Sequence, residues 1–115
     1  VLYGGITEEV LLRWGVMTLI AWLGWRFVQG GAGAVRARWI WMAIIVSALL
    51  FGAGHLPAVA AQTAQMDASL AAFVVLANTV FGVIFGFVYW RRGIEAAMLA
   101  HGIAHIVASV LAKAT

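Results

Sequence analysis

The chain contains four long apolar stretches, each close to the length needed to cross a lipid bilayer. They run from about Ile6 to Val28, from Arg38 to His55, from Ser69 to Trp90 and from Ile94 to Lys113. A membrane-spanning helix needs about 20 apolar residues, whereas a strand of a membrane barrel alternates in polarity over about 10. The sequence therefore predicts an all-α, polytopic transmembrane helix bundle with about four spanning helices.

The composition supports a lipid environment. Of the 115 residues, 65% are hydrophobic and only 10% are charged, whereas soluble domains carry about 25% charged residues. Four spans with short connections leave no room for a second domain, so we predict a single unit over residues 1–115. The chain opens at Val1 without an initiator methionine, and we expect it to be a piece of a longer polytopic protein.

The connections between the runs carry turn signals. Residues 29–34 are rich in glycine, and Gly93 follows two arginines, so turns are expected at both places. Pro57, the only proline, is expected to stop or kink the second helix. Residues 58–68 are less apolar and are predicted to form a short interfacial helix or a loop.

The basic residues flank the apolar runs instead of clustering on one face. This distribution is typical of membrane-topology determinants, not of nucleic-acid binders, so we expect a lipid bilayer as a partner and no nucleic acid. The arginines surround the first and third connections, and the positive-inside rule places these two connections in the cytoplasm. The residues concerned are Arg26, Arg36, Arg38, Arg91 and Arg92.

Six ionisable residues lie inside or at the edge of the predicted spans. Each costs at least ~2.5 kcal/mol on insertion scales, so such residues mark functional sites by default. Three of the four predicted helices contribute, which predicts that the side chains converge on one interior cavity. The six are Glu8, Glu9, Arg13, His55, His101 and His105.

The two adjacent acids are predicted to differ in their surroundings. Glu9 and Arg13 are four residues apart with the acid first, which is the favourable order for an ion pair within a helix. Glu8 points about 100° away from Glu9 around the helix and has no cation three or four residues on. Glu8 is therefore the better candidate for a chemical role, while Glu9 and Arg13 suit a structural pair.

The histidines leave two chemical interpretations open. His101 and His105 share one helix face, and this spacing can hold a divalent metal or can supply two N–H donors to a developing oxyanion. Each histidine taken alone equally suits an interhelical hydrogen bond, and His55 can meet water at a helix end. Gly82 and Gly86 form a G-x-x-x-G pattern, for which close helix packing is the simplest explanation.

Three motifs in this order resemble the type II CAAX prenyl endopeptidase family, also called the CAAX protease and bacteriocin-processing (CPBP) or Abi family. The E-E-x-x-x-R motif is found as Glu8-Glu9-Val-Leu-Leu-Arg13, and F-x-x-x-H as Phe51-Gly-Ala-Gly-His55. The third motif, usually H-x-x-x-N, is found as His101-Gly-Ile-Ala-His105. The resemblance covers nearly the whole chain.

The resemblance implies an intramembrane endopeptidase that hydrolyses a peptide bond of a membrane-associated or lipidated, CAAX-type peptide. It implies Glu8 as general base, His55 as the residue that holds the water, and His101 and position 105 as oxyanion donors. Glu9 and Arg13 would support the site. We expect no metal cofactor, and an integral multi-pass protein of a bacterial or archaeal cell membrane.

Three alternatives stand beside this interpretation, and the third is an ion or metal transporter with a pathway of acidic and histidine side chains. In the first, zinc bound by Glu8, His55, His101 and His105 serves the same hydrolysis, and His105 ligates a metal better than the usual asparagine. In the second, the chain is a non-catalytic bacteriocin-immunity or scaffolding protein. Convergence of the four residues also sets a condition on depth, because the first helix must begin before Val1 or the second must run past His55.

Overall fold

The computed structural model describes residues 2–114, and this part of the chain consists of helices and short connections, with no strand. The first apolar run forms one helical segment, Leu2–Val28, which begins before the predicted Ile6. The all-α prediction is confirmed. The first run itself alternates between two kinds of helix: α1 (Leu2–Glu9), the π-helix η1 (Val10–Met17), α2 (Thr18–Leu23) and the π-helix η2 (Gly24–Val28).

The remaining helices follow the predicted runs closely. They are α3 (Ala37–Gly54), α4 (Leu56–Gln62), α5 (Ala68–Arg92) and α6 (Ile94–Ala114). The glycine-rich connection contains three glycines with positive φ, at Gly30, Gly31 and Gly33, as a tight turn requires. Asp67 caps α5 by accepting a hydrogen bond from the Leu70 N–H at 2.7 Å.

Pro57 was expected to stop or to kink the second helix, and it does not stop it. Helical structure pauses at His55 and resumes at once as α4, with Pro57 in its first turn, where a missing N–H costs nothing. The proline therefore begins a short helix instead of ending a long one. Of the predicted helix or loop at 58–68, residues up to Gln62 are helical and 63–67 form the connection.

Three helical segments within residues 2–114 are long and apolar enough to cross a membrane: Ala37–Gln62, Ala68–Arg92 and Ile94–Ala114. The fourth helical segment, Leu2–Val28, is long enough as a whole, but it is divided by π-helical stretches and contains Glu8, Glu9 and Arg13. The bundle thus consists of three apolar helices and one that carries buried charge.

The centre of the bundle is the close contact between α3 and α5. A β-carbon added to Gly82 would lie 2.8 Å from the α-carbon of Ala48, and one added to Gly86 would lie 3.2 Å from Ile44 Cγ2. Gly82 has no room for a side chain, and a β-carbon at Gly86 would press on Ile44, so the G-x-x-x-G pattern acts as a packing motif, as predicted. The apolar core includes Ile44 and continues to Met17 of the first helix.

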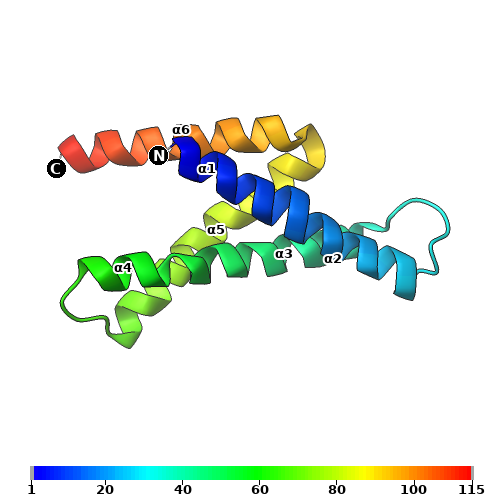
Figure 1. Cartoon of the computed structure of the whole chain (residues 1–115), viewed down its shortest axis with the longest axis horizontal. Coiled ribbons are helices and arrows are strands. Elements are labelled where there is room, and N and C mark those ends of the chain that lie inside the picture. Colours follow the sequence, from blue (N-terminus) through cyan, green and yellow to red (C-terminus); the bar gives the residue numbers. More distant parts are fainter. Residues whose placement is uncertain (1, 115) are drawn as a thin grey trace.

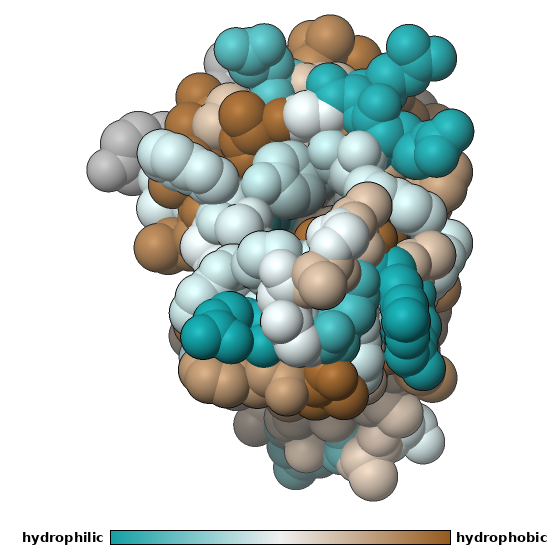
Figure 2. All heavy atoms as spheres, turned by 90° about the vertical axis from the view of Figure 1, so that its right-hand side faces the viewer, coloured by the Kyte–Doolittle hydropathy of each residue, from teal (hydrophilic) through white to brown (hydrophobic). Residues whose placement is uncertain are grey.

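The helices run back and forth, so that the connections flanked by arginine and the connection that contains Asp67 lie toward opposite ends (Figure 1). The 29–36 connection and the α5–α6 turn lie toward one end, and the 63–67 connection lies at the other. Figure 2 faces the first of these ends and shows hydrophilic side chains around less hydrophilic ones. Helix α1 lies beside α6, which brings the first and third sequence motifs together.

Candidate active site

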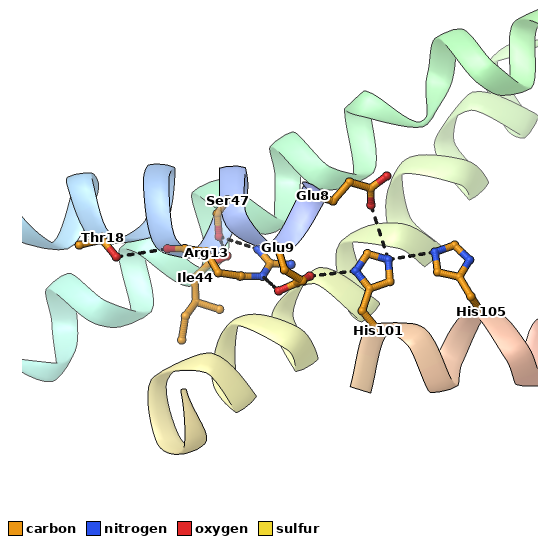
Figure 3. A network of polar contacts seen from close by, with 8 residues as sticks. All are labelled: Glu8, Glu9, Arg13, Thr18, Ile44, Ser47, His101 and His105. Atoms are coloured by element: carbon orange, nitrogen blue, oxygen red, sulfur yellow. Dashed lines mark hydrogen bonds and ion pairs between the residues drawn. The ribbon is translucent and has the colours of Figure 1, made fainter. Parts of the chain in front are cut away.

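Glu9 is the centre of a buried polar network that joins the first helix to α6 (Figure 3). One carboxylate oxygen, Oε2, accepts from Arg13 Nε at 3.1 Å, and the other, Oε1, accepts from His101 Nδ1 at 2.9 Å. Glu9 and Arg13 have no exposed surface, and His101 is 1% exposed. The predicted Glu9–Arg13 pair is confirmed. The contact with His101 was not predicted, and it places Glu9 next to the proposed chemistry.

The network continues from Arg13 into α3. Arg13 Nη1 donates to Ser47 Oγ at 3.1 Å, and the Ser47 hydroxyl donates to the Ile44 carbonyl at 3.1 Å. The Arg13 guanidinium carbon lies 5.7 Å from the centre of the Phe51 ring, within the range of a cation–π contact. Ser47 is fully buried, and sequence analysis missed it because an isolated serine in an apolar run carries little signal.

The π-helix supports this arrangement locally. It begins at Val10, directly after Glu9, and includes Arg13. A π-helical segment within an α-helix is rare and occurs most often at functional sites. Its i→i+5 pattern widens the turn, so residues four apart stay on one face, and the Thr18 hydroxyl donates to the Arg13 carbonyl five residues back at 3.2 Å. The sequence predicted an ordinary α-helix here, which was wrong for this segment.

His101 is fixed by rings as well as by Glu9. Its imidazole stacks on the Phe85 ring with centroids 4.6 Å apart and meets the edge of Phe51 at 5.4 Å. Because a carboxylate only accepts, Nδ1 carries the proton that bonds to Glu9. The opposite nitrogen, Nε2, is therefore the atom of His101 that is presented to Glu8 and His105.

Glu8 lies on the other side of His101 from Glu9. Its Oε2 atom is 3.5 Å from His101 Nε2, and its side chain is 39% exposed. That oxygen is buried and has no hydrogen-bond partner within the described part of the chain. The predicted difference between the two acids is confirmed: Glu9 forms a buried ion pair with Arg13, and Glu8 does not.

His105 lies one turn further along α6. Its Nε2 atom is 3.0 Å from His101 Nε2, and the two rings stack with centroids 4.8 Å apart. One of the two nitrogens donates to the other, so this N–H is engaged by the neighbouring ring. The predicted oxyanion donors are thus adjacent, but in this state they bond to each other.

His55 approaches the same region from the end of α3. Its Nδ1 atom donates to the Phe51 carbonyl at 2.7 Å, since a carbonyl oxygen only accepts. The Nε2 atom of a neutral His55 is then a hydrogen-bond acceptor. The His55 ring meets the Phe51 ring at 4.7 Å, so Phe51 contacts the rings of both His55 and His101.

The three histidines line one cavity of about 120 Å³. A water needs about 10–15 Å³ by this measure, so the space holds several waters or part of a peptide. Asn78 of α5 also borders the cavity, and its Nδ2 donates to the Val74 carbonyl at 2.9 Å. Sequence analysis missed Asn78. The remaining lining residues are apolar: Phe51, Phe81, Phe85, Ala104 and Ala108.

The structure therefore brings the predicted site residues together. Glu8 contacts His101, which contacts His105, and His55 borders the same cavity. The depth condition is met by α4, because helical structure continues past His55 and carries that residue away from the end of the helical run. The other way to meet it, a helix start before Val1, lies outside the described residues.

A model of the type II CAAX prenyl endopeptidase Rce1-like family matches residues 1–107. The chain belongs to this family. Comparison with curated proteins and with solved structures found no match. The family and the three apolar helices together identify an integral membrane protein, and the three motifs that resembled the family all fall within the matched range.

The side chains of this CAAX endopeptidase-like protein do not form a ready zinc shell. Among residues 2–114, no group of three or more histidine, aspartate or glutamate side chains is arranged to hold a metal ion. His101 has one nitrogen bonded to Glu9 and the other close to His105 and Glu8. Zinc would require His105 and His55 to turn toward a common point.

Proposed function

We propose that this protein is an intramembrane endopeptidase that hydrolyses a peptide bond of a membrane-associated or lipidated peptide, with water activated by Glu8. The observation that carries the proposal is that His55, His101 and His105 line one cavity and that Glu8, from a third helix, lies 3.5 Å from His101 Nε2. Membership of the CAAX endopeptidase-like family supports a peptidase in general. The apolar lining of the cavity suits an apolar or lipid-bearing substrate.

Glu8 is the general base. It takes a proton from a cavity water as the water oxygen bonds to the scissile carbonyl carbon, and the carbonyl electron pair moves to its oxygen. When the tetrahedral intermediate collapses, the C–N bond breaks and the leaving nitrogen takes the proton from Glu8. Glu8 suits this exchange because its Oε2 oxygen is buried and lacks a hydrogen-bond partner within residues 2–114.

The histidines hold the water and stabilise the oxyanion. His55 accepts from the water through Nε2, because its Nδ1 atom is committed to the Phe51 carbonyl. His105 exchanges its hydrogen bond to His101 Nε2 for one to the oxyanion as charge develops there, and His101, whose Nδ1 proton bonds to Glu9, donates from Nε2 only when that nitrogen is also protonated. Glu9 keeps Nδ1 of His101 protonated and thereby points Nε2 toward Glu8.

The decisive experiment is a cleavage assay with the full-length protein in liposomes. The substrate is an internally quenched peptide with a farnesylated cysteine near its C-terminus, and the same peptide without the lipid is the control. We expect cleavage of the lipidated peptide, a rate unchanged by an excess of chelator, and less than about 0.1 zinc per chain by elemental analysis.

The possible outcomes separate the candidate functions. Activity that is lost on chelation and restored by zinc would replace the proposed mechanism with the metal-dependent one. If neither peptide is cleaved while the protein still confers bacteriocin immunity on cells, the chain is a non-catalytic immunity or scaffolding protein. Equal rates on the two peptides would retain the protease and remove the lipid from its substrate requirement.

The unusual residue at position 105 provides a second test. Replacing His105 with asparagine, the residue usual in the family, is expected to keep kcat within about threefold, because an amide N–H can serve the same oxyanion. Replacing it with alanine removes the donor and should lower kcat by about 10²-fold. Cleavage rates of both variants are compared. A loss as large in His105→Asn as in His105→Ala would mean that the imidazole itself is needed, as a proton carrier or metal ligand.

A further inference from the structure

One end of the bundle carries a concentration of positive charge, which we call the arginine end. It comprises the exposed side chains of Arg26, Arg36, Arg38, Arg91 and Arg92 at the ends of the first helix, α3 and α5. Of the four acids in the sequence, only Glu95 lies there. The catalytic cavity is elsewhere: His105 is eleven residues beyond Ile94, the first residue of α6, about 16 Å along the helix axis.

A groove of about 510 Å³ opens at the arginine end, between the first helix and the α5–α6 turn, which we call the aromatic groove. Its walls include Ala21, Trp22 and Trp25 from the first helix and Tyr89, Trp90 and Gly93 from the α5–α6 region. Figure 2 views this end and shows hydrophilic side chains in groups around a less hydrophilic middle. The groove shares no lining residue with the catalytic cavity.

Three of the polar side chains that line the aromatic groove are already engaged in hydrogen bonds. The Thr18 hydroxyl and the Tyr89 hydroxyl bond to each other at 3.0 Å. Trp25 Nε1 donates to the Gly33 carbonyl at 2.9 Å, which ties the 29–36 connection to the first helix. A polar ligand would thus find few partners along these walls, whereas a hydrocarbon chain would bury apolar surface without leaving a donor unpaired.

The edge of the aromatic groove is different, because a guanidinium lies there. The Arg91 side chain stacks over the ring of Trp90, with its central carbon 5.6 Å from the ring centre. This contact holds the charge beside a wall of the groove. A site with a hydrocarbon slot and an adjacent guanidinium matches an amphiphile whose head is an anion, since guanidinium and phosphate form strong charge-assisted hydrogen bonds.

We propose that the aromatic groove binds an anionic phospholipid, with an acyl chain between Trp22 and Trp90 and the phosphate on Arg91. The other arginines surround the head group and add attraction without direct contact. Basic sites between helices on the cytoplasmic side bind anionic head groups, and the excess of arginine places this end on that side. The proposal is independent of peptidase activity.

Lipid retention by the full-length protein tests the proposal. The protein is released from liposomes that contain equal amounts of phosphatidylglycerol and phosphatidylcholine with identical acyl chains, and bound lipid is counted by native mass spectrometry. We expect one phosphatidylglycerol to be retained in preference to phosphatidylcholine by about tenfold. Arg91→Gln should lower this retention about fivefold, because it removes the one guanidinium that hydrogen-bonds directly to the phosphate.

Two further variants make the test specific. Arg38→Gln removes the same charge from the same end, but its guanidinium lies over Trp39, which does not line the groove, so retention should fall less than twofold. Trp22→Ala opens the groove at a residue that is already 46% exposed, and it should lower retention with little loss of stability. Equal retention of both lipids, or equal effects of Arg91→Gln and Arg38→Gln, would overturn the proposal.

Discussion

Replacing Glu8 with glutamine is expected to lower kcat by about 10³-fold, within the range that a general base contributes. Glutamine keeps the size of the side chain but cannot accept the proton of the attacking water. The Glu8 side chain is 39% exposed and does not take part in the buried Glu9–Arg13 pair. The free energy of unfolding should therefore change little, and KM should change less than kcat.

The neighbouring acid supplies the control for this variant. Glu9→Gln makes the same chemical change one residue along, but it removes the buried negative charge and leaves one acceptor oxygen for two donors, Arg13 and His101. It should lower both activity and stability, whereas Glu8→Gln should lower activity alone. Single-turnover cleavage and thermal unfolding of the two full-length variants are measured side by side. Activity above about one tenth of wild type in Glu8→Gln would assign the base to another group.

The sequence was sufficient to predict that this chain lies in a membrane, and it also predicted several local contacts. Long apolar runs exclude an aqueous environment regardless of how the helices pack, so the all-α membrane bundle followed directly. The Glu9–Arg13 pair and the close packing at Gly82 and Gly86 were equally predictable. Both depend on the spacing of residues within one helix. For Glu9 and Arg13, that spacing keeps the two side chains on one face even though the helix changes from α to π at Val10.

The contacts between helices were less predictable, because they depend on how each helix is rotated and how deeply it lies. Glu9 and His101 are 92 residues apart in the sequence, and no local pattern indicates which of the two adjacent acids reaches His101 more closely. Ser47 and Asn78 become significant only when their helices face the site. The π-helix at Val10 likewise has no sequence signal that we can identify.

Replacing Arg13 with methionine is expected to lower the free energy of unfolding by about 3–5 kcal/mol, the usual cost of breaking a buried ion pair from one side. Methionine fills similar space but leaves the Glu9 carboxylate, which has no exposed surface, without its cation. It also leaves the buried Ser47 hydroxyl without the Arg13 donor. Reversible unfolding of the full-length protein in mixed micelles measures the change.

A matched double variant distinguishes loss of the pair from loss of packing. In Glu9→Leu with Arg13→Met, neither charge remains, and replacing both members of a buried pair with apolar groups is often close to neutral. We expect the double variant to be more stable than Arg13→Met alone. If the two losses simply add, the pair contributes nothing as a pair, and the effect of Arg13→Met comes from its packing.

The activity of the same double variant tests the second task assigned to Glu9. Without the carboxylate, His101 Nδ1 loses its acceptor, and the ring is free to present either nitrogen to Glu8. Stability should therefore recover in the double variant while kcat stays low, by about 10²-fold or more. Recovery of both would show that Phe85 and Phe51 alone hold the imidazole, and that Glu9 serves only the ion pair. Because stability and activity respond to different partners of one carboxylate, this pair of measurements separates its structural contribution from its contribution to the chemistry.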